Sequence, residues 1–397
     1  MWYTKKVIIF IIIFFTQQSI LYAVTSIKTY PPDVSFCIVD LKYNKPHVKI
    51  CEFGQGVVSG FYGHERINQR IPMWSHLWDF LHELAIPAFF IGPRPLDVRA
   101  NYSKAIEHFV QLGGIAQTDF KSLEKNNYFK EYFKRKTNNA YSFFNPHQAA
   151  GVLVSSQHHL IFDYYKTIKK KYPNLLILDE ATRPFVLNKL RTHQLFAGDP
   201  TLECYRPQCL VVPKIYSPTL AQTIISSITS DYFVIKPINA WKGRGLIFVH
   251  RDELDTTLKL ILDKNTSTQY PSKAFSYWNK DKNTCFLVES LEHSQPIIVE
   301  GHHYDATMRV AFGIAYSKGK IVVRFFDAYW KLPRQSLDNP TSLDETYKSN
   351  IRHGEVCSAH VNKQTFKEVT QFLKKILPPL YRKMIAAQND LTLLSTR

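Results

Sequence analysis

The sequence predicts an α/β protein with more than one domain. From about residue 30 to residue 180, apolar segments of strand length alternate with amphipathic helical segments, which is typical of an open α/β sheet. The 397 residues exceed the roughly 100 to 200 residues of an ordinary domain, and 45% of them are hydrophobic. The pattern changes at Asp179, where a second unit begins. We therefore expect an N-terminal α/β domain over residues 24–178 and a second domain over residues 179–397.

Composition excludes several classes of protein. The 27 Phe and 22 Tyr residues exclude a disordered chain, which cannot carry so many groups that drive collapse. Collagen, a coiled coil and a multispanning membrane protein are excluded because the chain has no Gly period, no sustained heptads and one long apolar run. The 50 Lys and Arg against 33 Asp and Glu give a net charge of +17, which fits nucleic acid, an anionic membrane or small anionic ligands.

The N-terminus carries the features of a secretory signal peptide. Lys5 and Lys6 precede the apolar residues 7–15, and a small residue, Ala23, stands where cleavage would occur. This interpretation makes residues 1–23 a signal peptide and the protein an exported one, periplasmic or secreted. An uncleaved anchor would also place the body outside the cytoplasm, with membrane contact through this segment alone. A buried first strand is the third alternative.

Six cysteines allow two interpretations. Export would permit disulfides, whereas buried free thiols are the plainer alternative. No pair has Cys-x-x-Cys spacing, so the sequence gives no support for a metal site built on sulfur. The cysteines are Cys37, Cys51, Cys204, Cys209, Cys285 and Cys357.

The first domain is expected to contain the following elements in order. Two strands are joined by a turn containing Asn and Pro, and a Gly-rich loop follows at residues 53–63. A basic, aromatic segment at residues 121–136 is either a solvated helix face or a surface for an anionic partner. The strands are expected at 34–41, 47–53, 85–91, 153–162 and 175–178, and the helices at 74–84, 102–112 and 164–171.

The second domain is expected to begin with a helix at residues 185–198 that Gly198 ends. Strands and helices then alternate up to a long helix at 364–387. The strands are expected at 209–213, 232–235, 246–250, 285–291, 301–310 and 320–326, and a further helix at 217–228.

A hairpin with a Gly-rich tip is the first candidate for chemistry. The strand before Lys236 runs into a loop that contains Lys242, Gly243 and Gly245, and another strand follows. Glycines let backbone N–H groups close around an anion, and lysines neutralise its charge. The loop is not a Walker motif, because no Gly-Lys-Ser/Thr opens a helix.

A second candidate lies on the strand at 301–310. Asp305 and Arg309 fall on one face of it, because side chains alternate along a strand. Opposite charges on an otherwise apolar strand are costly to bury, so they predict a polar cleft.

In this order, the motifs of residues 179–394 resemble those of the ATP-grasp superfamily of carboxylate–amine ligases. They are similar to those of ribosomal-protein glutamate ligases and tubulin-tyrosine-ligase-like enzymes. The resemblance implies a two-lobed ATP-grasp fold that binds ATP and Mg²⁺. The segments that carry it include 187–196, 233–237 with the Gly-rich tip, 287–291, 301–310 and 350–354.

The resemblance also implies roles for single residues. A γ-phosphoryl group of ATP would pass to a carboxylate, and an amine would attack the acylphosphate of a small acid or a peptide. Arg309 would stabilise the developing charge, while Lys331 and Asn350 would hold phosphate or the substrate carboxylate. The implied cofactor-binding residues are Lys189, Lys236, Lys242, Gly243, Gly245, Glu289, Ser290, Leu291 and Asp305.

One departure from the family concerns the metal. Residues 389–394 resemble the strand that carries the first magnesium ligand, here Asp390, but no Glu-x-Asn strand follows before Arg397. Three explanations are open, namely a shortened reading frame, a nucleotide-binding pseudoenzyme, or a variant that recruits Asp327 or Glu355. We expect either truncation or loss of activity rather than a new ligand set.

Two other functions compete with the ligase. A nucleotide-binding pseudoenzyme would retain the fold for a regulatory or interaction role. A basic nucleic-acid-binding protein would use residues 121–136, but the sequence contains no recognised nucleic-acid-binding module and its aromatic residues lack a stacking period.

Overall fold

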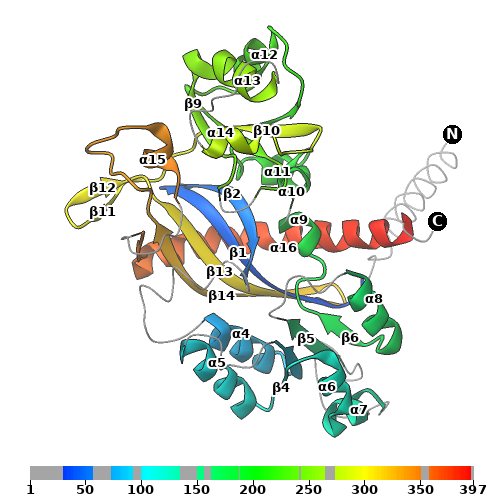
Figure 1. The fold of residues 1–397 in the computed structure, drawn as a ribbon. Coiled ribbons are helices and arrows are strands. Elements are labelled where there is room, and N and C mark those ends of the chain that lie inside the picture. Colours follow the sequence, from blue (N-terminus) through cyan, green and yellow to red (C-terminus); the bar gives the residue numbers. More distant parts are fainter. Residues whose placement is uncertain are drawn as a thin grey trace, which may run out of the picture.

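A computed structural model describes residues 30–56, 73–92, 100–134, 150–155, 162–186, 188–240, 243–263, 273–349 and 357–394. The predicted α/β class is confirmed, since helices and three larger sheets alternate along the chain. Figure 1 shows a central sheet between two lobes, one formed by residues near the N-terminus and one by residues of the middle of the chain. In the described residues, no helix has the length and apolar character needed to cross a membrane. The expected signal segment, residues 1–23, lies outside this description.

The central sheet joins both ends of the chain. Its strand order is β15-β14-β13-β1-β2, and every neighbouring pair is antiparallel. The two predicted N-terminal strands therefore form as expected but do not belong to the N-terminal α/β sheet, because β1 pairs with β13 instead. The strands are β1 (Asp33–Asn44), β2 (His47–Gln55), β13 (Thr307–Ser317), β14 (Lys320–Lys331) and β15 (Ser358–His360).

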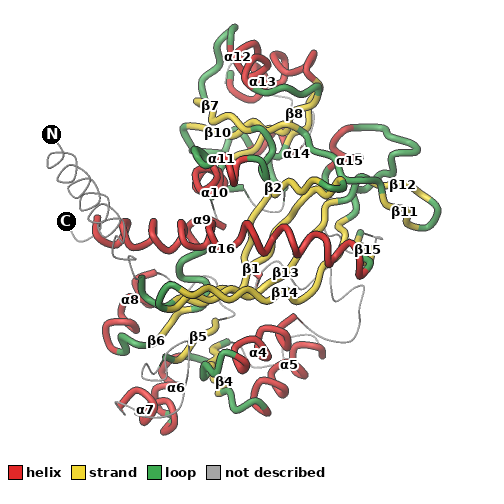
Figure 2. Tube along the Cα trace, turned by 180° about the vertical axis from the view of Figure 1, so that it is seen from behind, coloured by secondary structure: helices red, strands yellow, loops and turns green. Residues whose placement is uncertain are grey.

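Strand β1 is buried on both faces. Its odd-numbered residues, such as Val39 and Leu41, pack in one apolar cluster with α16 (Lys363–Leu394). Its even-numbered residues Phe36 and Ile38 pack in another cluster with α4 (Met73–Glu83). Figure 2 shows α16 lying across one face of the sheet. A central strand covered on both faces reads as a nearly continuous apolar run, as the sequence of β1 does.

The N-terminal lobe contains the predicted open α/β sheet, and this sheet is parallel. Its strand order is β4-β3-β5-β6, with parallel pairing throughout. The basic segment packs Phe129 and Tyr132 inward against the sheet, whereas its Tyr128 is exposed. The strands are β3 (Ala88–Ile91), β4 (Ile115–Gln117), β5 (Gly151–Ser155) and β6 (Leu175–Ile177), and the further helices are α5 (Ala100–Gln111), α6 (Phe120–Lys125), α7 (Asn127–Lys134) and α8 (Phe162–Lys171).

The other lobe, called the antiparallel lobe below, is built on an antiparallel sheet of order β7-β10-β8-β9. Its helices cover an apolar core around Trp278 and Phe286. The strands are β7 (Cys209–Pro213), β8 (Tyr232–Pro237), β9 (Ile247–His250) and β10 (Cys285–Ser290), and the helices are α12 (Leu220–Ser227), α13 (Leu254–Leu262) and α14 (Lys273–Tyr277). A small hairpin of β11 (Ile297–Val299) and β12 (His302–Tyr304), with α15 (Leu343–Tyr347), projects beside the central sheet (Figure 1).

One helix prediction and one strand prediction need correction. The helix expected over 185–198 is divided into α9 (Arg183–Val186) and α10 (Lys189–Phe196), because Asn188 is extended and its side chain caps α10 by accepting from the Arg191 amide. Gly198, with a φ of 75°, ends the segment as predicted. The strand expected at residues 389–394 is wrong, since these residues continue α16 as a helix.

All six cysteines are free thiols, so none of the disulfides that export would permit is formed.

Two buried aspartates connect β1 with residues 179–181 and with α16. Asp33 accepts hydrogen bonds from Ser35 at 3.0 Å, from the Ala181 amide at 3.0 Å and from the Tyr381 hydroxyl. Asp179 accepts from the Phe36 amide at 2.6 Å. Burial raises the pKa of Asp33 to about 6 and that of Asp179 to about 7.

These buried aspartates predict that the free energy of unfolding falls as the pH rises from about 4 to about 7. The folded protein binds a proton at Asp179 more tightly than the unfolded chain does. The stabilisation that this proton binding contributes is therefore complete below about pH 4 and is lost as the pH rises through about 7. Asp179→Asn keeps an acceptor for Phe36 but does not titrate. At pH 8 it should therefore be more stable than the parent by on the order of 4 kcal/mol.

Urea unfolding at pH 5 and pH 8 measures the difference. Asp119→Asn serves as the control, because Asp119 is an exposed helix cap. Equal pH dependence in the parent protein and in Asp179→Asn would contradict the assignment.

Candidate functional site

A cleft opens between the antiparallel lobe and the edge of the central sheet. It has an empty volume of about 880 Å³, part of it open to solvent, which is within the range of small-molecule sites. Six basic and four acidic side chains line it, so its wall carries an excess of positive charge. They are Lys42, Lys189, Lys236, Arg244, Lys331 and Lys348, with Asp40, Glu52, Glu289 and Glu292.

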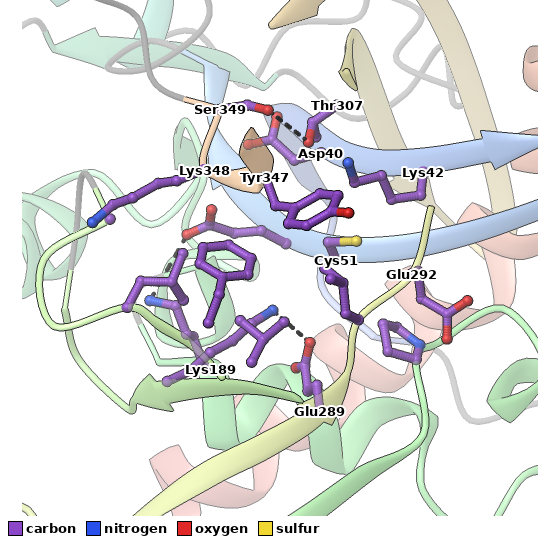
Figure 3. A pocket seen from close by; sticks show the side chains of 18 of the residues that line it. Asp40, Lys42, Cys51, Lys189, Glu289, Glu292, Thr307, Tyr347, Lys348 and Ser349 are labelled. Carbon is purple, nitrogen blue, oxygen red and sulfur yellow. Dashed lines mark hydrogen bonds and ion pairs between the residues drawn. The ribbon is translucent and has the colours of Figure 1, made fainter. Parts of the chain in front are cut away.

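The cleft draws its walls from distant parts of the sequence. Figure 3 shows Asp40, Lys42 and Cys51 of the β1–β2 hairpin on one side and Lys189 and Glu289 on the other. Tyr347, at the end of α15, also points into the space between them.

A buried ion triad forms the wall contributed by the antiparallel lobe. The carboxylate of Glu289 on β10 accepts hydrogen bonds from Lys236 Nζ at 2.5 Å and from Arg206 Nη2 at 2.8 Å. Burial opposes ionisation of Glu289, but the two cations outweigh it and hold its pKa below the ordinary value. Burial likewise disfavours the charge on Lys236, and the attraction of Glu289 reverses that effect and raises its pKa.

Lys189 is a cleft cation that is only weakly neutralised by a carboxylate. It opens α10, and its ammonium donates to the Ala240 carbonyl oxygen. The Lys189 ammonium lies 3.8 Å from Glu52 Oε1. Burial lowers the pKa of Lys189, so a bound anion would restore the stability of its charged form.

The Gly-rich turn lies beside Lys189. Gly243 and Gly245 both have a φ of 67°, a left-handed conformation that favours glycine. A Cβ on Gly245 would lie 2.5 Å from the Tyr277 ring and 2.6 Å from Pro237, so a side chain has no room there. Gly243 and Arg244 line the cleft, whereas Gly245 stands behind it and accepts from Trp278 Nε1 through its carbonyl oxygen at 3.0 Å.

The opposite wall contains a second buried ion triad. Arg309 donates from Nε to Asp40 Oδ1 and from Nη2 to Asp40 Oδ2, both at 2.7 Å. Lys331 Nζ donates to Asp40 Oδ2 at 2.8 Å. Burial raises the pKa of Asp40, but the two cations outweigh this effect and bring it far below the ordinary value. Burial is also the main reason that the pKa of Lys331 is lowered.

Asp305 stands apart from Arg309. Its carboxylate accepts from Lys42 Nζ at 2.7 Å and lies 2.6 Å from His293 Nδ1. The predicted polar environment of this strand is therefore present, but Asp305 and Arg309 belong to two separate ion pairs.

Most of the predicted site residues meet in this cleft. Seven of them line it directly, namely Lys189, Lys236, Gly243, Glu289, Ser290, Leu291 and Lys331. Arg309 reaches it through Asp40, while Gly245 and Asp305 lie adjacent to lining residues. Lys242 and Asn350 lie outside the described residues, as does the side chain of Asp390.

Residues 287–291, which resemble the strand that hydrogen-bonds adenine through its backbone in the ATP-grasp family, have some of their amides engaged within the protein. The Ser290 amide donates to the Gln208 carbonyl at 2.9 Å, and the Leu291 amide donates to the Tyr232 carbonyl at 3.0 Å. These two amides are therefore engaged within the protein, which leaves carbonyl oxygens or later residues to contact an adenine ring.

Sequence reasoning missed the residues supplied by the N-terminal hairpin. Asp40 and Lys42 carry opposite charges two residues apart on an apolar strand, the same signal that identified the strand of Asp305 and Arg309. Arg206 was missed too, because nothing in its local sequence connects it with Glu289.

The described residues do not make a magnesium site. Within the described ranges, no three His, Cys, Asp or Glu side chains form a group that could hold a metal ion. The two most buried carboxylates of the cleft, Asp40 and Glu289, each bind two cations already. We therefore derive no chemical step through Mg²⁺.

Comparisons with known proteins are distant. No protein-family model matches the chain, and no curated protein matches it significantly. Among solved structures, one described as a gamma-glutamylcysteine synthetase from Methylobacillus flagellatus KT is similar with 10% identity and a TM-score of 0.43, covering 92% of this chain and 91% of its own.

Two further structures show weaker similarity. A D-cycloserine synthetase has 11% identity and a TM-score of 0.36, covering 76% of this chain and 82% of its own. A D-alanyl-alanine synthetase A from Vibrio cholerae O1 biovar eltor str. N16961 has 10% identity and a TM-score of 0.34, covering 76% and 81%. Likenesses this distant assign no activity to the chain.

The Glu289 triad predicts a large loss of stability in Glu289→Gln. The amide would leave Lys236 and Arg206 buried without their shared counter-charge, which should cost about 3 kcal/mol or more. Denaturant unfolding measures this, with Asp338→Asn as the control because that carboxylate contacts His303 on the surface. A loss below about 1 kcal/mol would mean that the triad contributes no more than a surface pair.

Proposed function

We propose that the cleft binds ATP and that the protein is an ATP-dependent carboxylate–amine ligase acting through an acylphosphate. One observation carries the proposal. The segments that the sequence relates to nucleotide binding, around Lys189, Lys236, Gly243 and Glu289, line the same cleft as Lys331. They come from different elements and different parts of the chain, so their convergence supports a single ligand site.

The charges of the cleft suggest how ATP would lie. Lys189, the Gly243 turn and Arg244 form one group of donors that suits phosphate oxygens. The Val234 and Leu291 side chains border the same space and offer apolar contact for a base. Lys236 is already neutralised by Glu289, so Lys189 is the stronger candidate for a direct phosphate contact.

The carboxylic acid substrate would then bind against the wall of the cleft that carries Arg309 and Lys331. These two cations both contact the carboxylate of Asp40. Charge that develops on the transferred phosphoryl group would be stabilised there. Neither the acid nor the amine is identified by these contacts, and a peptide or a small carboxylic acid fits them equally.

A second candidate function is nucleotide binding without catalysis. The observation that favours it is the engagement of Asp40 and Glu289 by two cations each, which leaves neither carboxylate available to a divalent ion.

We also propose that the protein is exported, on the basis of residues 1–23. Fractionation of cells that express the full chain would test this.

Lys189→Met should weaken ATP binding at least about tenfold, since a charge-assisted hydrogen bond to phosphate contributes about 1.5–3 kcal/mol. Titration calorimetry with ATP, in the presence and absence of Mg²⁺, measures the affinity. The control is Lys383→Met, which contacts Asp199 and the Leu195 carbonyl outside the cleft. Absence of ATP binding by the parent protein would refute the proposed function, and equal affinity in Lys189→Met would refute the phosphate assignment.

Release of ADP separates the ligase from its alternative. We expect ADP formation that requires ATP, a carboxylic acid and an amine together, because the acylphosphate forms only on an acid and turns over only with an amine. A coupled assay over panels of amino acids and short peptides measures it, with Arg309→Gln as the inactive comparison. ATP binding without ADP formation in any combination would favour the non-catalytic function.

A further inference from the structure

Asp40 occupies an unusual place between two cations of different strands. Its two carboxylate oxygens accept hydrogen bonds from Nε and Nη2 of Arg309, and Oδ2 also accepts one from Lys331 Nζ. Paired, parallel hydrogen bonds of this kind fix the plane of a guanidinium as well as its position. The side chain of Asp40 is 4% exposed, so water does not compete effectively for these contacts.

Strand pairing aims Asp40 at this position. Asp40 lies directly opposite Arg309 in the β1–β13 pair and opposite Glu52 in the β1–β2 pair. The β1–β2 register shifts between Asp40 and Leu41, because Asp40 pairs with Glu52 and Leu41 pairs with Ile50. The extra residue, Cys51, therefore lies on β2, and the position of Asp40 follows from its pairing with Arg309 on β13.

Lys331 lies among several charged and polar groups. Asp40 accepts hydrogen bonds from both Lys331 and Arg309. Glu52 on β2 contributes a further, weaker attraction to Lys331, and the Tyr329 hydroxyl lies 3.5 Å from Arg309 Nη1. Without Asp40, the pKa of Lys331 would fall, because desolvation and repulsion from Arg309 both disfavour the charged amine.

We propose that Asp40, supplied by the N-terminal hairpin, is the positioning residue of this wall of the cleft: it fixes the Arg309 guanidinium and keeps Lys331 charged. The functional meaning of this role rests on the proposed function, because a ligand is needed to use the two cations. The role itself belongs to the ligand-free protein. Asp40 acts through Arg309 and Lys331 and contacts no reacting group itself.

The test follows the titration of Lys331 directly. Full-length protein is produced with lysine labelled with ¹³C at Cε, whose chemical shift changes when the amine loses its proton. The Lys331→Arg variant identifies the resonance by its loss. Titrations are then compared for the parent protein, Asp40→Asn, Arg309→Gln and, as a remote control that also removes a carboxylate, Glu368→Gln, which contacts Tyr43 and Lys45.

We expect the pKa of Lys331 to fall by about 1 to 3 units in Asp40→Asn and to rise in Arg309→Gln, where Asp40 serves Lys331 alone. Glu368→Gln should leave it unchanged. An unchanged titration in Asp40→Asn would overturn the proposal. If Asp40→Asn does not fold, Asp40→Glu decides, because a role confined to packing predicts no change in the titration of Lys331 when the carboxylate is moved, and an unchanged titration there would overturn the proposal.

ATP calorimetry on the same samples keeps the two proposals separate. If Lys331 shifts as expected but the parent protein binds no ATP, Asp40 retains its positioning role and the proposed function fails. If ATP binds but Lys331 does not shift, the positioning role fails and the nucleotide site stands.

Discussion

The pairing of β1 with β13 is the constraint on which the cleft depends. It places Asp40 opposite Arg309 and buries β1 on both faces. Along one face of β1, the even-numbered residues Phe36 and Ile38 pack toward the N-terminal lobe, and Asp40 and Lys42 continue that face into the cleft. A register shift of one residue would exchange the two faces and turn these charges into the apolar layer beneath α16. The same pairing therefore fixes the core and the charged wall together.

Both walls of the cleft use the same electrostatic arrangement. A buried carboxylate, Asp40 or Glu289, accepts hydrogen bonds from two cations of neighbouring elements. Isolated buried charges would be strongly destabilising, whereas these groups are both paired and hydrogen-bonded. The arrangement keeps four cations in place within a largely desolvated site.

The sequence predicted elements and candidate residues better than it predicted how segments assemble. The strands leading to Lys236 and Glu289 carry strong apolar periodicity, so their positions follow from local pattern, as does the stop at Gly198. The membership of β1 in the central sheet does not follow, because an apolar strand pairs equally well in an adjacent parallel sheet. The helical continuation at residues 389–394 was missed because a short apolar run fits a strand or a helix. Arg206 meets Glu289 only through tertiary packing, and no local pattern encodes that contact.

The sheet that joins both ends of the chain also bears on biosynthesis. Asp40 and Arg309 are 269 residues apart in sequence, and α16, which covers the sheet, follows later still. A nascent chain exposes the apolar hairpin of β1 and β2 until β13 has left the ribosome, and such long-range pairing closes slowly. The parallel sheet of the N-terminal lobe, by contrast, draws its strands from a short stretch of sequence. The cleft consequently assembles late, because a synthesis intermediate that lacks β13 and β14 lacks Thr307 and Lys331 of one wall.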